Sequence, residues 1–280
     1  MSSPATPATP DSTQQTLHDV TISQRLRSFP SRIILRYEPT EIFEEFLVGN
    51  FHIKYVVFNA TDAAKLVRDH GSVHAVLEDW QIPIVTATDP DADIYNRQRD
   101  DIRELLANIQ PAIYIPDAGT VYWDEPDSQE GGLRFFIRRL EWVIDEVEKN
   151  NWNIAVLPLA KGMEKWHYEI LRDCYERHDF SNYAFYCKQY FGEDRGNRIS
   201  QLESHIQNLI DVMNAKKILV IALLSENYLR RLQPQVQAAC GIYQFAANCK
   251  EDGQFIEVDF VDWRDNLENT LSDKPTVIQQ

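Results

Sequence analysis

The alternation of short β-branched segments with longer helical patterns constrains the fold of this chain more than any other feature of its sequence. The strand-like segments are residues 32–37, 54–59, 82–86, 112–116, 153–159, 183–186, 217–224 and 255–260. Segment 217–224 is apolar on both faces, which is typical of a parallel strand covered by helices on each side. Seven or eight β-then-α units in one domain predict the α/β class and favour a (β/α)8 TIM-type barrel, regular or irregular. An open doubly wound sheet is the alternative.

Between these segments, apolar residues recur at helical spacing. Helices are expected at residues 38–47, 97–109, 133–149, 163–178, 199–214 and 225–232. Thr61 is expected to cap a further helix that follows segment 54–59. The acidic run of Asp89, Asp91 and Asp93 lacks the glycine and the distal glutamate of a calcium loop, so we expect a solvated, helix-capping turn there.

The ends of the chain differ in composition from its middle. Residues 1–28 carry three prolines within the first ten positions and few apolar side chains, so disorder is expected there. Residues 29–272 are expected to form a single β/α-barrel domain, and residues 273–280 a flexible tail. No basic residue precedes Arg25 and no signal-like apolar segment follows it, and the longest apolar run is far too short to span a bilayer. We therefore expect a cytoplasmic protein.

The net charge, the cysteines and the absent motifs limit which ligands and cofactors the sequence can be expected to bind. The 43 acidic residues outnumber the 28 Lys and Arg, and the net charge of −15 opposes non-specific nucleic-acid binding without forbidding a local basic cleft. The four cysteines form no CxxC pair, so we expect reduced, buried thiols and no metal site. Neither GxGxxG, GxxxxGK[ST], GxSxG nor HExxH occurs, and no cofactor is expected.

In a barrel, function gathers on the loops that follow the carboxyl ends of the strands. Asp117 follows an apolar strand and precedes Ala118 and Gly119, so a ligand could approach the backbone closely there. Its carboxylate could bind the N–H edge of a purine-like base, or it could simply close an Asx-type turn. The same rule selects Lys161, the polar segment around residues 186–193, Ser225 and Glu226, and the Asp259/Asp262 pair.

Three segments resemble the tRNA-guanine transglycosylases, the queuine and archaeosine enzymes, and their DNA-modifying 7-deazaguanine relatives. Residues 115–122 are similar to the DSGGFQ segment of that family, and residues 156–193 and 217–241 are similar to two later segments. The resemblance implies a barrel pentosyltransferase that exchanges guanine for a 7-deazaguanine in tRNA or DNA. It implies catalytic Asp117 and substrate contacts from Gly119, Lys161, Gly162 and Tyr186.

The sequence also departs from that family. Thr120, Val121 and Tyr122 stand where the family has a glycine, a phenylalanine and a glutamine, and no carboxylate follows Gly241 where the family has its nucleophile. Without a nucleophile, a covalent intermediate cannot form at that position. Asp259 or Asp262 is expected to replace it, although strand alternation lets only one of them enter the barrel.

Three functional hypotheses follow from these residues. The first is a divergent base-exchange transferase that binds a flipped nucleotide, with Lys161, Lys165, Arg195 and Arg198 supplying phosphate contacts. The second is a non-catalytic descendant that binds a nucleobase, a nucleic acid or a protein. The third is an unrelated barrel or α/β enzyme in which Asp117 only closes a turn. By resemblance, a homodimer or a partner subunit is also expected.

Overall fold

The computed structural model describes residues 29–30, 32–119, 121, 125–192 and 196–274. Eight parallel strands form one sheet in the order β5-β4-β3-β2-β1-β10-β9-β6. They are β1 (Arg32–Arg36), β2 (Tyr55–Asn59), β3 (Ile82–Thr86), β4 (Ile113–Ile115), β5 (Ala155–Val156), β6 (Asn182–Tyr186), β9 (Lys217–Ile221) and β10 (Val236–Gly241). The predicted α/β class is confirmed.

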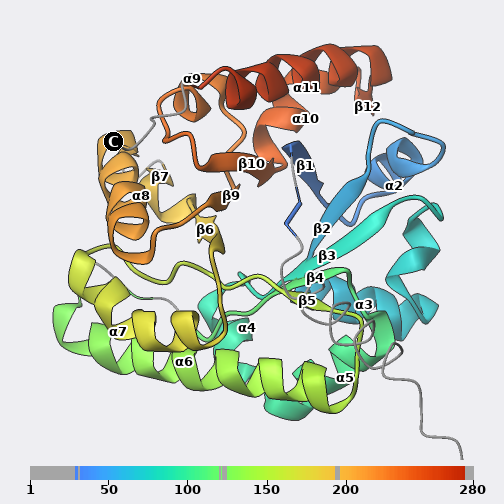
Figure 1. Ribbon diagram of the computed structural model, residues 1–280. Helices are drawn as coiled ribbons and strands as arrows, with labels where there is room; N and C mark the ends of the chain where they lie inside the picture. Colours follow the sequence, from blue (N-terminus) through green and yellow to red (C-terminus); the bar gives the residue numbers. More distant parts are fainter. Residues whose placement is uncertain (1–28, 31, 120, 122–124, 193–195, 275–280) are drawn as a thin grey trace, which may run out of the picture.

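The sheet curls so that its two edges approach each other (Figure 1). No ladder joins edge strands β5 and β6 in the described part of the chain, but a parallel bridge links Leu159, just after β5, to Ala184 of β6. Two backbone hydrogen bonds support it, because the Ala160 N–H donates to the Ala184 carbonyl and the Ala184 N–H donates to the Pro158 carbonyl. The sheet is thus a curled, TIM-type arrangement without a complete ladder at this edge.

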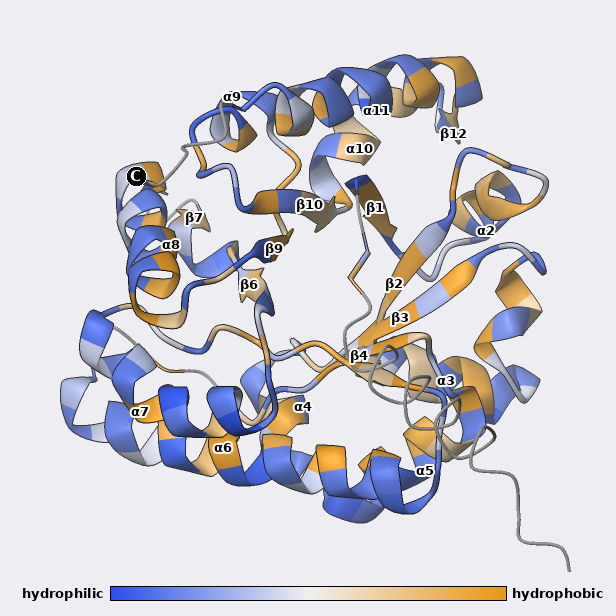
Figure 2. Ribbon diagram, viewed as in Figure 1, coloured by the Kyte–Doolittle hydropathy of each residue, from blue (hydrophilic) through white to orange (hydrophobic). Residues whose placement is uncertain are grey.

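Long helices follow most strands and cover the outer face of the sheet (Figure 1). They are α2 (Glu41–Leu47), α3 (Ala60–His70), α5 (Arg99–Ile109), α6 (Pro126–Lys149), α7 (Lys165–Arg177), α8 (Ile199–Met213) and α11 (Glu257–Ser272). Hydrophobic residues lie along one side of the helical ribbons and hydrophilic residues along the other (Figure 2). Burial of the apolar stripe against the sheet stabilises each helix, as their helical periodicity predicts.

Shorter elements complete the chain between the long ones. They are η1 (Val73–Val76), α4 (Asp91–Asn96), η2 (Lys188–Tyr190), β7 (Phe191–Gly192), β8 (Gly196–Asn197), α9 (Glu226–Leu229), α10 (Tyr243–Cys249), β11 (Lys250–Glu251) and β12 (Gln254–Phe255). Thr61 lies inside α3 instead of capping it, and Asn59 occupies the N-cap without a side-chain bond.

The last strand of the sheet is not where the sequence pattern placed it. Segment 255–260 alternates apolar and polar residues, but residues from Glu257 onward form helix α11, whose buried Phe260, Leu267 and Leu271 follow helical spacing. The eighth strand is β10, which sequence reasoning missed. Its residues after Val236 are small or polar, and alanine, cysteine and glycine give little β-strand signal.

An aromatic cluster fixes the C-terminal elements to the start of the barrel. Phe245 of α10 stacks on Phe255 with ring centroids 4.5 Å apart and meets Phe46 of α2 at 5.3 Å and Phe260 of α11 at 5.6 Å. Such pairs add about 0.5–1.5 kcal/mol each beyond the area they bury. The chain end therefore closes the helical layer beside β1.

All four cysteines are buried and free, as predicted. None of the helices in the described ranges combines the length and the apolar character that a membrane crossing requires. The predicted disorder of residues 1–28 and most of the predicted tail lie outside the described residues.

Candidate functional site

Three strands of one half of the sheet end in residues whose side chains share one face. Asn59 is the in-register partner of Thr86, and Thr86 is the partner of Ile115. Arg36 pairs with Val57, two residues before Asn59. In-register partners project to the same side of a sheet, and so do residues two apart along a strand. Arg36, Asn59 and Thr86 therefore point in one direction.

That direction is the inside of the curled sheet. Tyr37, which follows Arg36, contacts Phe43 of the outer helix α2 with ring centroids 6.1 Å apart. Because successive residues alternate between the faces, Arg36 points inward. Tyr186 shares the inner face, since β9 and β10 connect it in register to Ile34, two residues before Arg36.

Asp117 and Lys161 meet at the same end of the sheet. Asp117 lies two residues after the end of β4, and Lys161 follows β5. Lys161 Nζ is 2.5 Å from Asp117 Oδ1, and the two side chains are 10% and 3% exposed. Their pairing joins neighbouring strand ends 44 residues apart in sequence. We call Arg36, Asn59, Thr86, Asp117, Lys161 and Tyr186 the mouth cluster.

The Asp117 carboxylate also closes its own turn. Oδ1 accepts hydrogen bonds from the Ala118 N–H at 2.7 Å and the Gly119 N–H at 3.3 Å. Burial raises the pKa of Asp117, while Lys161 and the two N–H groups oppose that rise. The Asx-type turn, one of the two interpretations that the sequence left open, is therefore present. In addition, Asp117 forms a nearly buried ion pair with Lys161.

A second buried ion pair follows β3. Arg97 Nη2 lies 2.9 Å from Asp89 Oδ2, and the Asp89 side chain is fully buried. Arg97 Nη2 also donates to Thr61 Oγ1 at 2.9 Å, which connects this pair to the start of α3. The prediction of a solvated turn is therefore wrong for Asp89, whereas Asp91 and Asp93 do lie in the first turn of α4. Sequence reasoning missed this pair, because nothing local joins positions 89 and 97.

The charges of the mouth cluster act on one another. Burial raises the pKa of Tyr186, Asp117 and Asp89 raise it further, and Arg36 lowers it. Side chains from four different strand ends therefore surround one region. Arg36 is half-buried and forms no hydrogen bond or ion pair with the residues that the structure describes. Burial raises the pKa of Asp62 and the Arg36 charge opposes that rise, but no carboxylate is within ion-pair distance of the guanidinium in the described ranges, and such a group favours an anion as its ligand.

A cavity of about 250 Å³ lies beside the strand ends. Met163, two residues after Lys161, is one of the residues that line it. Residues that follow β4, β5 and β6, together with α8, form its wall. They are Pro126, Gln129, Met163, Glu164, His167, Gln189, Tyr190, Arg198, Gln201 and His205. Nothing local in the sequence indicates that His167 and His205 lie together, because their meeting depends on how α7 packs on α8.

His167 is held as a neutral imidazole in this wall. Its Nδ1 accepts from the N–H groups of Met163 at 3.0 Å and Glu164 at 3.1 Å, so Nε2 carries the proton and donates to Gln129 Oε1 at 2.9 Å. Burial lowers the pKa of His167 to about 4. His205, whose pKa burial also lowers, lies with Nδ1 2.7 Å from the Tyr190 hydroxyl.

The two glycines predicted to contact substrate, Gly119 and Gly162, pack closely against aromatic side chains of the same protein. A Cβ on Gly119, whose φ is +129°, would lie 2.8 Å from the Tyr95 hydroxyl, and a Cβ on Gly162 would lie 2.8 Å from the Tyr168 ring. The absence of a side chain therefore allows close packing at both positions. Their role as substrate contacts stays a prediction.

The Asp259/Asp262 prediction is corrected by the structure. Both residues lie in the first two turns of α11, exposed, and not in a strand. Neither carboxylate is an ion-pair partner of the mouth cluster in the described part of the chain. Of the expected phosphate contacts, Lys165 is exposed and pairs with Asp211 at 3.0 Å, and Arg195 lies outside the described residues.

Comparison with known proteins gives no family. No family model and no curated protein matches the chain. A solved structure described as "Native KDPGal structure" resembles it with a TM-score of 0.41 and 10% sequence identity, covering 87% of this chain and 94% of the other. At that score the likeness carries no argument about the function of this chain.

The expectation of a tRNA-guanine transglycosylase is therefore wrong. No family model matches the chain, and the carboxylates expected to replace the nucleophile lie on an outer helix. The second hypothesis, a non-catalytic binding protein descended from that family, is unsupported for the same reason. The nucleic-acid, 7-deazaguanine and homodimer partners rested on the same resemblance, and no contact in the structure tests them.

Proposed function

We propose that this protein is a (β/α)8-type barrel enzyme that binds a small anionic carbonyl compound at the carboxyl ends of its strands and moves the proton next to the carbonyl group. The observation that carries the proposal is the Asp117–Lys161 pair, in which two nearly buried, opposite charges from adjacent strand ends lie 2.5 Å apart. Strand carboxyl ends are where barrel enzymes place their catalytic groups.

The two members of the pair have complementary chemistry. An ammonium group such as that of Lys161 stabilises negative charge that develops on a carbonyl oxygen. A carboxylate whose pKa is raised by burial, as at Asp117, accepts a proton more readily than an ordinary one. In the proposed step the C–H electron pair forms the enolate double bond, the carbonyl π electrons move to oxygen beside Lys161, and the proton passes to Asp117 Oδ2.

Arg36 supports an anionic substrate. Its guanidinium projects inward from the end of β1 and has no ion-pair partner among the described residues. A planar guanidinium binds a carboxylate or a phosphate through two parallel hydrogen bonds. In the proposed complex Arg36 orients the anion and the Asp117–Lys161 pair acts on the carbon beside the carbonyl.

The test is proton exchange in D2O with three probes: pyruvate, 2-oxobutyrate and dihydroxyacetone phosphate. Loss of the proton signal next to the carbonyl is followed by ¹H NMR. We expect exchange of at least one probe above the rate in buffer and a decrease of at least 100-fold in Asp117→Asn, which keeps the Oδ1 acceptor for its turn but removes the base.

Two further variants sharpen the test. Asp117→Asn/Lys161→Met leaves no unpaired buried charge, so it is the folded reference that should lack exchange. Arg36→Gln should raise the KM for the active probe more than it lowers kcat, because Arg36 binds the anion away from the reacting carbon. Lys165→Met, on the exposed pair with Asp211, should leave the rate unchanged. Equal exchange by the wild type and the folded double variant would refute the proposal.

A further inference from the structure

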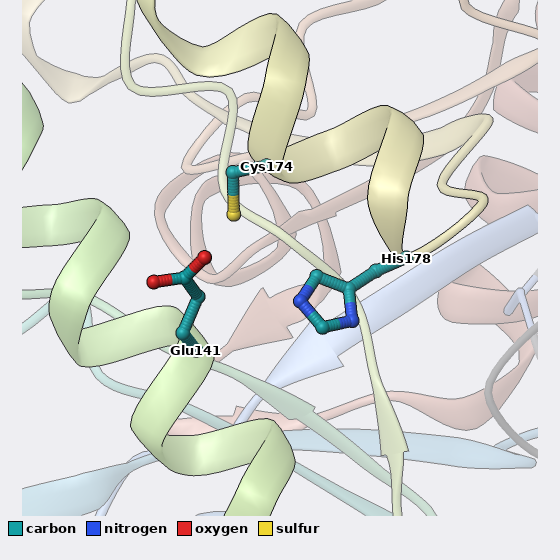
Figure 3. A group of neighbouring side chains, drawn as sticks. All are labelled: Glu141, Cys174 and His178. Carbon is teal, nitrogen blue, oxygen red and sulfur yellow. The ribbon is translucent and has the colours of Figure 1, made fainter.

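A group of three metal-binding side chains lies between α6 and α7, apart from the mouth cluster. Glu141 is on α6, and Cys174 and His178 are at the C-terminal part of α7. One oxygen, one sulfur and one nitrogen from these residues all lie within 4.8 Å of one another. Figure 3 shows the three side chains directed toward a common space between the two helices.

The local helical geometry explains this arrangement. Cys174 and His178 are four residues apart, so they share one face of the helix, and the His178 N–H donates to the Cys174 carbonyl at 3.3 Å as α7 ends. Helices α6 and α7 pack against each other, which brings Glu141 to that face. The packed helices therefore position the donors without contribution from a flexible loop.

The donor atoms are free of other strong partners. Within the described residues, neither the Cys174 thiol nor the His178 ring forms a hydrogen bond or an ion pair. Glu141 Oε1 pairs with Arg177, and its other carboxylate oxygen has no ion-pair partner in the part of the chain that the structure describes. An arginine that holds one oxygen of a carboxylate leaves the second oxygen oriented for a metal, as outer partners do in known metal sites.

We propose that Glu141, Cys174 and His178 bind one Zn²⁺ ion, with water as the fourth ligand. Thiolate, imidazole and carboxylate are the donors that zinc prefers, whereas calcium and magnesium take oxygen alone. Zinc–ligand bonds of about 2.0–2.3 Å place the donors of this tetrahedral site about 3.3–3.6 Å apart, so the three donor atoms need to approach one another by at most about 1.5 Å through rotamer adjustment.

Binding at this site is coupled to a proton. A cysteine binds zinc as the thiolate, so the Cys174 thiol must lose its proton when the ion binds. On binding, the S–H bond breaks, its electron pair forms the S–Zn bond, and the proton passes to solvent. Zinc affinity should therefore increase with pH, and the ion would cross-link α6 to α7. This inference does not depend on the proposed function.

The experiment uses the full chain, freed of metal and kept reduced, with Zn²⁺ and Co²⁺ as the probes. We expect one equivalent of Zn²⁺ in equilibrium dialysis. Co²⁺ should give a thiolate-to-cobalt charge-transfer band and the visible bands of a four-coordinate ion. Cys174→Ser should abolish the charge-transfer band, and His178→Gln should weaken Zn²⁺ binding by at least about 10-fold. Cys187→Ser, at a buried thiol outside the cluster, should retain both properties.

The half-buried His178 makes His178→Gln the variant least liable to disturb folding, which circular dichroism verifies. An unchanged Zn²⁺ affinity in His178→Gln would overturn the site. A charge-transfer band that persists in Cys174→Ser would do the same, because the sulfur ligand would then be another cysteine.

Discussion

We expect the substitution Lys161→Met to lower the free energy of unfolding, because it breaks the Asp117–Lys161 ion pair. The variant leaves a carboxylate that is 3% exposed without its cation. Removing one partner of a buried pair costs about 3–5 kcal/mol of unfolding free energy, because the remaining charge stays desolvated. The matched control is Lys165→Met, whose pair with Asp211 is 58% and 40% exposed and should contribute about 0–1 kcal/mol.

The loss of unfolding free energy in Lys161→Met should also depend on pH. The folded pKa of Asp117 is raised above its unfolded value by burial, so the folded state holds the proton more tightly. Stability from such a group is present at low pH and is lost as pH rises through the folded pKa. Without Lys161 that pKa rises further. The difference between variant and wild type should therefore be smaller at pH 5 than at pH 8.

Urea unfolding followed by circular dichroism at the two pH values measures both effects. Asp117→Asn/Lys161→Met should recover most of the lost stability, because it restores charge balance. A loss below about 1 kcal/mol in Lys161→Met, equal at both pH values and equal to that of Lys165→Met, would refute the reasoning that this pair is buried and coupled.

Two further predictions concern other parts of the molecule. The pKa of His167 is lowered to about 4, so its protonation favours unfolding: stability should fall by up to about 3 kcal/mol as pH drops from 6.5 toward 4. His167→Gln should reduce that slope in acid urea titrations, whereas His70→Gln, at an exposed site, should keep it. Phe245→Ala should lower the unfolding free energy by about 3–5 kcal/mol, because the fully buried ring contacts several other aromatic rings. Phe51→Ala, at a side chain that is 76% exposed, should stay within about 1 kcal/mol of the wild type, and equal losses in the two variants would contradict the assignment of the core.

Much of the fold could be predicted from local sequence pattern. Seven of the eight sheet strands fall on apolar segments rich in β-branched or aromatic residues, and the long helices carry apolar stripes at helical spacing. The carboxyl ends of β4 and β5 were also readable, and they led to Asp117 and Lys161. These features are local, because strand and helix periodicities depend on residues a few positions apart.

The rest depended on contacts between distant segments. Small residues form β10 because neighbouring strands pair with it, and residues 257–260 begin a helix because Phe260 docks on the aromatic cluster. The Asp89–Arg97 pair, the cavity wall of His167 and His205, and the Glu141–Cys174–His178 group likewise form only when separate elements pack.

The sequence by itself therefore determined the alternation of strands and helices and the polar character of two strand ends. Tertiary structure decided which strand completes the sheet and which charges are desolvated together. The physical reason is that periodicity is encoded within one element, whereas ion pairing and burial depend on the register and curl that bring strand ends into one mouth.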